Sequence, residues 1–317
     1  METDASAASQ SPSWSPEVGP LRVTSSPDCG RFYVAARDIG PGEVLLMEEP
    51  EALVIRESQV QQVCRACLLS GQRMPVSCLC AYAWYCSEAC RAADRLHPSE
   101  CVCLQRYCHP ESRCSDSRTF VRLLIQLLCQ RQQRKHRALD LHDGLDAFKQ
   151  MKDWNDRRGR YRKLIQSFSE TVSDGLTWRH DQLEAMLGMI ECNRFDLWSK
   201  HRKHRLGMAL YTLGSIFNHS CAPNVARVQR GAAAEFRAIA EVSEGDALTL
   251  AYVDPRLDKS ARGRELRARY GFTCACCACS GGGSPSVDLC PRHLGYMIPR
   301  LGPDSPAAWC SVCGAPS

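Results

Sequence analysis

The strongest constraint on the fold is a set of closely spaced cysteines in the first third of the chain. They form four pairs whose members are separated by one to three residues, and the last pair contains a histidine. Zinc takes four such ligands in a tetrahedron, so eight ligands predict two zinc sites. A segment this short buries too little apolar surface to fold without such cross-links. The eight candidate ligands are Cys64, Cys67, Cys78, Cys80, Cys86, Cys90, His97 and Cys101.

The composition of the chain indicates whether these cysteines bind metal or form disulfides. The chain has 21 cysteines among 317 residues, no apolar leader follows Met1, and the longest apolar run, residues 123–129, is too short to cross a bilayer. We therefore expect a soluble intracellular protein with no membrane contact, in which paired cysteines bind metal rather than form disulfides. A hydrophobic content of 44% is typical of a globular chain.

A second informative stretch runs from Ser215 to Asn224. Asn218 and His219 follow an apolar, helix-compatible run, residues 208–217, and precede Pro223, so polar groups are expected where a buried segment turns. Asn-His-Ser also matches a glycosylation sequon, which is the alternative interpretation. Downstream lie a strand-like segment at residues 247–252, an arginine-rich helix, and the residues Tyr252, Tyr270, Phe272, Cys274, Cys276 and Cys279.

Two helices and a strand pair are expected elsewhere. Residues 119–131 have helical apolar spacing, and a second helix is expected to start at Asp181, whose side chain would cap it together with Glu184. Residues 30–36 and 39–46 are expected to form strand, turn and strand. The buried side of the second helix is predicted to contain Leu183, Met186, Leu187 and Ile190.

In the order and spacing of these motifs, residues from about 30 to 279 resemble the SET-domain lysine methyltransferases, and within them the SET-and-MYND subfamily. The resemblance implies an α+β fold: a split SET β-fold with a pseudoknot, an inserted MYND zinc finger, a helical SET insertion and a cysteine-rich post-SET tail. The expected parts are a disordered N-terminus (1–20), the first SET part (21–62), the finger (63–101), the helical insertion (102–192), the catalytic SET part (193–272) and the zinc-binding tail (273–317).

The resemblance also implies a site. Tyr252 is expected to orient the transferred methyl group, while Tyr270 and Phe195 line a lysine channel. Phe195 and Asn193 are equally compatible with ordinary residues after a helix. Phe32 replaces the second glycine of the family's first strand, where bare backbone lets the cofactor approach. The residues implied to bind S-adenosylmethionine are Gly30, Arg31, Asn193, Asn218, His219, Tyr252 and Phe272.

The resemblance assigns the metal ligands to interleaved zinc sites. In the finger, one site would contain Cys64, Cys67, Cys86 and Cys90, and the other Cys78, Cys80, His97 and Cys101. The post-SET cysteines supply three ligands, and Cys221 is expected as the fourth, with Cys277 as its competitor. The spacing of the last cluster predicts a fourth site from Cys290, His293, Cys310 and Cys313.

The function implied is S-adenosylmethionine-dependent methylation of a lysine on a histone or non-histone protein. The alternative is a catalytically inactive adaptor that acts through the finger, and Phe32 favours it. A proline-rich peptide is the implied partner of the finger. Basic clusters at residues 131–137, 157–163 and 200–205 favour solvated surfaces, with nucleic acid as the alternative partner. We expect a monomer in the cytoplasm or nucleus.

Overall fold

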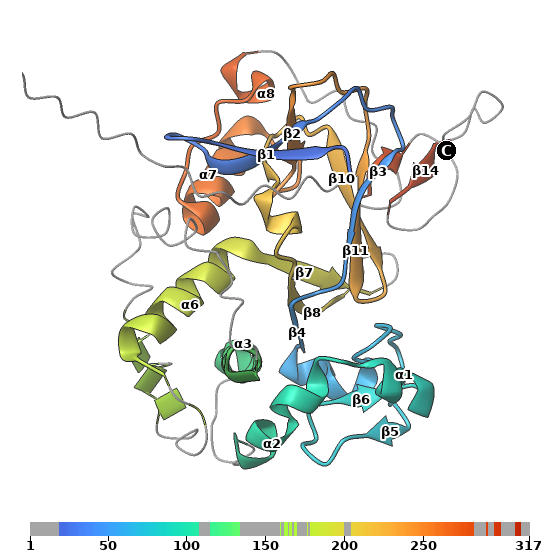
Figure 1. The fold of residues 1–317 in the computed structure, drawn as a ribbon, viewed down its shortest axis with the longest axis vertical. Coiled ribbons are helices and arrows are strands. Elements are labelled where there is room, and N and C mark those ends of the chain that lie inside the picture. The colour runs from blue at the N-terminus through green and yellow to red at the C-terminus, as the bar shows by residue number, and fades with distance from the viewer. Residues whose placement is uncertain are drawn as a thin grey trace, which may run out of the picture.

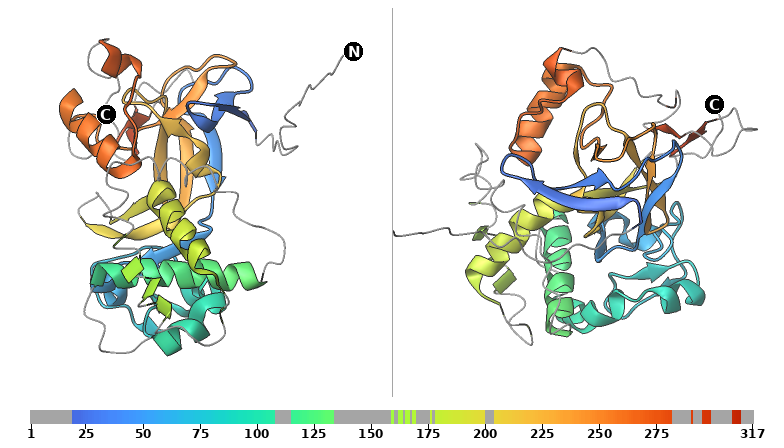
Figure 2. Two further views of the ribbon diagram at one scale, coloured as in Figure 1. Left: turned by 90° about the vertical axis from the view of Figure 1, so that its left-hand side faces the viewer. Right: turned by 45° about the horizontal axis from the view of Figure 1, so that its top comes forward.

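The structure, a computed structural model, describes residues 19–107, 115–133, 178–199, 204–281, 290, 295–298 and 308–311, with scattered residues between 159 and 176. The SET strands gather at one end of the molecule, and the finger and the helices α2 and α3 at the other (Figures 1 and 2). Of the basic clusters, most residues lie outside the described part. Among the described helices, none is both long and apolar enough to span a bilayer.

The first sheet brings the two ends of the SET sequence together. Its order is β1 (Leu21–Ser26), β2 (Gly30–Ala35), β12 (Ala247–Leu250) and β9 (Asn218–His219). The β1–β2 and β2–β12 pairs are antiparallel, whereas β12 and β9 are parallel. This parallel pair places the Asn-His dipeptide directly beside the strand that leads to Tyr252. The predicted strand at residues 247–252 ends at Leu250, so Tyr252 lies just beyond it.

The second sheet contains the second of the two strands expected near the start of the fold. Residues 30–36 and 39–46 do contain strands, β2 and β3 (Val44–Glu48), but the two do not pair with each other. Instead β3 pairs with β11 (Ala233–Ala238), which pairs with β10 (Val225–Arg230). The predicted order of strand, turn and strand is confirmed, and after the turn the chain enters another sheet.

The third sheet corrects one expectation, the helix-compatible run at residues 208–217. Residues 205–210 form the strand β8 (Arg205–Leu210), between β4 (Ala52–Ile55) and β7 (Arg194–Trp198), and only Gly214–Ile216 is helical, as the 3-10 turn η3. A fully buried central strand shows no period-2 alternation, so its sequence resembles a buried helix. Gly207 marks the strand because a Cβ there would lie 2.1 Å from the carbonyl oxygen of Val54.

Helix α3 (Ser115–Gln133) covers the free edge of β4. The predicted helix at residues 119–131 is confirmed, and its apolar positions are buried. Three polar side chains spaced four residues apart, those of Arg122, Gln126 and Gln130, are buried as well. They hydrogen-bond the edge of β4, which would otherwise be unpaired. The bonds run from Arg122 Nη2 to Ile55 O (2.5 Å), from Leu53 N to Gln126 Oε1 (2.6 Å) and from Gln130 Nε2 to Glu51 O (2.7 Å).

Helix α6 (His180–Asn193) packs beside α3 in the same apolar core. The predicted buried side is confirmed, but the predicted cap is wrong. The N-cap is Arg179, whose backbone N–H donates to Gln182 Oε1, and Asp181 lies inside the first turn and forms an ion pair with Arg179. An acidic residue is favourable anywhere in the first turn of a helix, so the residue type alone does not distinguish the N-cap from a position inside that turn. The predicted cap, Asp181, therefore lies two residues after the observed cap, Arg179.

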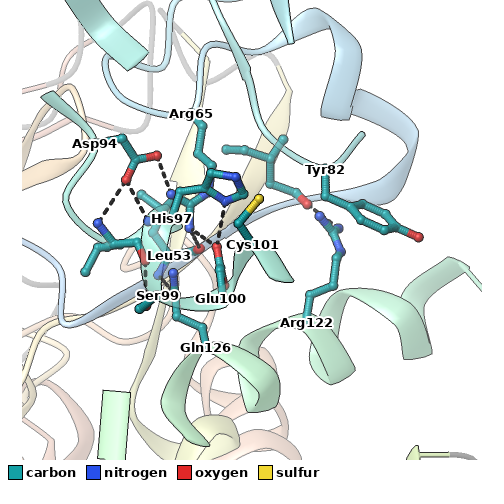
Figure 3. A network of polar contacts seen from close by, with 12 residues as sticks. Leu53, Arg65, Tyr82, Asp94, His97, Ser99, Glu100, Cys101, Arg122 and Gln126 are labelled. Carbon is teal, nitrogen blue, oxygen red and sulfur yellow. Dashed lines mark hydrogen bonds and ion pairs between the residues drawn. The ribbon is translucent and has the colours of Figure 1, made fainter. Parts of the chain in front are cut away.

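The finger follows the 3-10 helix η1 (Glu57–Gln62) and contains β5 (Val76–Ser77), β6 (Trp84–Tyr85), α1 (Glu88–Ala93) and α2 (His97–Tyr107). Arg65 connects it to the SET sheets. Its side chain is 5% exposed and lies between the carboxylates of Asp94 and Glu100, the latter at 2.5 Å (Figure 3). Its Nη2 also donates to Leu53 O of β4 at 3.3 Å.

We expect Arg65→Met to destabilise the chain by about 3–5 kcal/mol, because it leaves Asp94 and Glu100 as buried, unpaired carboxylates. The matched control is Arg91→Met in the same finger. Arg91 is exposed and its contact with Glu88 is 3.6 Å long, so we expect a change within about 0.5 kcal/mol. Chemical denaturation measures both, and equal losses for the two variants would contradict the role assigned to Arg65.

Candidate functional site

The eight finger ligands form two groups, with the pairing implied by the resemblance. Within each group the ligand atoms lie within 4.8 Å of one another. A tetrahedral zinc ion with Zn–S bonds of about 2.3 Å places its sulfurs about 3.8 Å apart, whereas a disulfide needs about 2.05 Å. Observed separations are 3.7 Å for Cys67 and Cys86, 3.5 Å for Cys86 and Cys90, and 3.2 Å for Cys78 and Cys101. The geometry therefore fits a metal ion.

His97 is held in position for this role. Its Nε2 lies 3.6 Å from Cys80 Sγ, while its Nδ1 lies 3.4 Å from the Glu100 carboxylate (Figure 3). A carboxylate behind the ring sets the orientation and tautomer of a metal-binding histidine. Because Glu100 is also the partner of Arg65, the second finger site is connected through two side chains to β4.

The third group joins Cys221 to the tail, as the resemblance implied. Cys221 is fully buried and lies 3.5 Å from Cys279, which belongs to the short helix α8 (Cys277–Ser280). Cys277, the competing ligand, is exposed and outside the group. The complete group is Cys221, Cys274, Cys276 and Cys279.

One thiol in each of two groups is already prone to ionise. Burial acts to raise the pKa of Cys78 and of Cys276, but neighbouring backbone N–H groups, of Cys80 and Cys221 respectively, lower it to about 6. Thiolates are the form of cysteine that binds metal. Burial raises the pKa of other thiols in the same groups, among them Cys80 and Cys274, so these ionise only when a metal ion is bound.

The last predicted cluster is only partly described. Cys290 and Cys310 are buried together with Met297, where β13 (Met297–Ile298) pairs with β14 (Trp309–Cys310). His293 and Cys313, the other two members of the predicted fourth zinc site, lie outside the described residues. The fourth site therefore stays a prediction.

The aromatic residues predicted to be catalytic line one cavity of about 290 Å³. Phe195 comes from β7, Tyr252 from the end of β12, and Tyr270 from the last turn of α7 (Lys259–Tyr270). The rings of Tyr252 and Tyr270 lie 4.9 Å apart, and Phe195 packs edge-on against Tyr211 at 5.4 Å. Asn193 also lines the cavity, although its amide donates to Met189 O at 2.9 Å, as an end-of-helix residue does.

Tyr252 is fixed at three points. Its hydroxyl donates to Phe217 O at 2.7 Å, its backbone N–H donates to His219 Nδ1 at 3.0 Å, and its ring lies 5.2 Å from the His219 ring. Burial raises the pKa of the Tyr252 phenol well above its usual range, with Tyr270 acting in the same direction, so the hydroxyl stays protonated. Burial lowers the pKa of His219 to about 4, so the imidazole is neutral at pH 7.

The residues predicted to bind the cofactor form a second group next to the cavity. His219 lies 5.8 Å from the Phe272 ring, and Asn218 Nδ2 donates to Cys29 O at 3.1 Å, just before Gly30. Gly30 has a φ of +63°, which glycine adopts without strain, and a Cβ there would meet no heavy atom within 4 Å. Arg31 follows it in β2. Of this group, only Tyr252 and Asn193 also line the cavity.

Phe32 occupies the face of β2 away from the core. Side chains alternate along a strand, and the neighbouring positions Tyr33 and Ala35 are buried at 1% and 0% exposure. Phe32 is only half-buried. The Phe32 ring therefore does not fill the hydrophobic core.

Several cavity residues carried no recognisable sequence signal. The acidic side chains that line the cavity are largely neutralised: Asp196 contacts Arg194 at 3.2 Å and Arg205 at 3.0 Å, and Asp254 contacts Arg256 at 2.9 Å. Arg194 lies two residues before Asp196 in β7, and Arg256 two residues after Asp254, whereas Arg205 belongs to the neighbouring strand β8. This spacing matches no motif. The further lining residues include Cys192, Trp198, Arg227, Tyr296 and Ser311.

Comparison with known proteins agrees with this geometry. The model of the SET domain family matches residues 30–253. Histone-lysine N-methyltransferase SMYD3 of Mus musculus is 29% identical over 79% of this chain and 59% of its own length. Histone-lysine N-methyltransferase ASHR1 of Arabidopsis thaliana is 26% identical over 84% of this chain and 56% of its own length. The chain thus spans 56–59% of the length of these two relatives.

Among solved structures, Rubisco LSMT bound to AdoMet is 13% identical, with a TM-score of 0.41 over 81% of this chain and 52% of that one.

Metal analysis tests the third group. We expect Cys279→Ser to lower the zinc content of the folded chain by one ion, because three ligands are left where a closed site needs four. The control Cys277→Ser alters the neighbouring, exposed thiol and should keep all the zinc. Both contents can be measured by mass spectrometry of the metal. Loss of an ion from Cys277→Ser alone would show that the fourth ligand has been misassigned.

Proposed function

Since this chain belongs to the SET-domain family and to its SET-and-MYND subfamily, we propose that it is a protein-lysine N-methyltransferase. The methyl donor is S-adenosylmethionine, and the acceptor is the ε-amine of a lysine in a histone or non-histone protein. The observation that carries the proposal is the position of Tyr252. Tyr252 lines the aromatic cavity, and its ring also lies against His219 and Phe272 of the group that contains Asn218.

The second group has the chemistry that the methyl donor needs. The backbone at Gly30 is open to a ligand, and the amide of Asn218 and the ring of Phe272 lie on either side of His219. When bound, S-adenosylmethionine supplies a methyl group on a positively charged sulfur. The residues that would hold it are Gly30, Arg31, Asn193, Asn218, His219, Tyr252 and Phe272.

The cavity residues prepare the acceptor amine. Phe195, Tyr252 and Tyr270 surround it with aromatic rings that exclude water, and a poorly hydrated amine is more readily neutral and nucleophilic. The nearby carboxylates of Asp196 and Asp254 are paired with arginines, so they do little to stabilise an ammonium ion. The fixed Tyr252 hydroxyl, a dipole at the inner end, orients the reacting groups.

The three metal groups have a supporting role in this proposal. Zinc at Cys221, Cys274, Cys276 and Cys279 would hold the tail against the Asn-His dipeptide, and Tyr270 and Phe272 lie directly before those ligands in the chain. Among the described residues, Tyr252, Tyr270 and Phe272 all pack against the same small cluster as Cys221. The metal would therefore shape the cavity without taking part in the reaction.

A Tyr252→Phe exchange tests the assignment. We expect methyl transfer to fall by about 10²-fold, because the dipole that orients the reacting groups is lost, while the affinity for S-adenosylmethionine stays the same. Transfer of a labelled methyl group into whole lysate and calorimetric titration measure the two quantities. Tyr85→Phe is the matched control, since Tyr85 donates to Asp94 in the finger, far from the cavity in sequence and fold.

The same titration separates the proposal from an inactive adaptor. If the natural chain does not bind S-adenosylmethionine, the enzyme proposal fails, and Phe32 becomes the first residue to examine. An adaptor would lose its partners on Cys64→Ser and keep them on Tyr252→Phe.

We also propose, from the resemblance and from exposed apolar side chains, that the finger binds a proline-rich peptide. Leu79, between two zinc ligands, is 91% exposed, and Val102, after Cys101, is 58% exposed. Such side chains on a small domain are common at contact surfaces. That the chain is a monomer, and that it works in the cytoplasm or nucleus, are proposals that rest on composition.

A further inference from the structure

The tail after the third metal group contributes to the cavity. Tyr296 and Ser311, at the β13–β14 hairpin, line the same cavity as Phe195, Tyr252 and Tyr270. Tyr296 also packs against Ala226 and Val228 of β10. The hairpin, red in Figure 2, is therefore docked on the SET sheet and forms part of the wall.

The backbone around Tyr296 is firmly held. Its N–H donates to Ser311 Oγ at 2.9 Å, and its carbonyl accepts from the Ser311 N–H at 2.8 Å. Ser311 is only 6% exposed, and the neighbouring Cys290 and Cys310 are buried at 6% and 0% exposure. Paired hydrogen bonds beside a buried cluster keep the side chain at one place on the wall.

Because the cavity is small, the side chains of this wall affect what can bind in it. A volume of about 290 Å³ is at the small end of ligand pockets, which span about 300–1,000 Å³. In so small a space, each large side chain on the wall takes up a sizeable part of the surface open to a ligand. Tyr296 shares the lining with Trp198 and Arg227, and also with Tyr252, whose hydroxyl is assigned the orienting role.

We propose that Tyr296 is a substrate-positioning residue, whose ring packs against the substrate lysine or the peptide residue beside it. The inference rests on the proposed function and adds a specificity element from the tail. Tyr296 packs on β10, whereas the orienting role is assigned to the Tyr252 hydroxyl. Removal of the Tyr296 ring is therefore expected to affect substrate binding more than the reaction rate.

Kinetics of three variants test the proposal. The probe is the best substrate from a synthetic peptide library with one central lysine and varied flanking residues. We expect Tyr296→Ala to raise KM about tenfold with little change in kcat, because a buried aromatic contact is lost. Tyr296→Phe, which keeps the ring, should restore the natural KM. Calorimetry should give an unchanged affinity for S-adenosylmethionine in both.

Met297→Ala is the control for a merely structural role, because Met297 is buried in the hairpin and does not line the cavity. The positioning role is overturned if Tyr296→Ala leaves KM unchanged. It is also overturned if Tyr296→Ala matches Met297→Ala in lowering kcat, cofactor affinity and thermal stability together.

A chemical probe separates failure of this inference from failure of the proposed function. Cys192 lines the cavity, so its alkylation by iodoacetamide, followed by peptide mass spectrometry, reports access to that space. We expect faster alkylation in Tyr296→Ala than in the natural chain and in Tyr296→Phe; equal rates would overturn the wall assignment. If the natural chain methylates no library peptide, the proposed function fails, whereas this readout still decides whether the tail closes the cavity.

Discussion

A buried guanidinium, that of Arg65, connects the finger to the SET sheets. It contacts Asp94 and Glu100 and also reaches the Leu53 carbonyl of β4. Glu100 in turn faces the imidazole of His97, a ligand of the second finger group. A buried cation between two carboxylates has a large desolvation cost that good geometry must offset. This polar contact set therefore fixes the finger against β4, beside the apolar core that the finger shares with α3.

The arrangement of the candidate site depends on one short segment of the chain. The segment Phe217–His219 contacts Tyr252 three times: through a carbonyl, a ring nitrogen and a ring face. Two residues later, Cys221 ties the same segment to the tail cysteines. A short stretch thus orients the central tyrosine on one side and holds the tail on the other. This explains why residues far apart in the chain meet at one cavity.

The sequence predicted the features that depend on local spacing. Paired cysteines and the apolar face of α6 follow from short-range geometry, and both are confirmed. The Met208–Leu210 strand was mistaken for helix because a strand buried on both faces lacks alternation. The start of α6 was predicted too late in the chain, because Arg179 is an unusual N-cap residue and its type does not indicate a helix start. The place of Tyr296 depends on long-range docking of the tail, about which local patterns carry no information.

The edge of β4 shows how a helix can take the place of a strand. Four residues of helix advance about 6.0 Å, and two residues of strand advance about 6.6 Å. Side chains at Arg122, Gln126 and Gln130 therefore stay nearly in step with alternate backbone groups of β4, in the antiparallel sense. The mismatch of about 0.6 Å between the two spacings adds up from one hydrogen bond to the next. Helix side chains and strand backbone groups can therefore stay paired over only a few such bonds. A short strand is thus a geometric requirement of this arrangement, and β4 has only four residues.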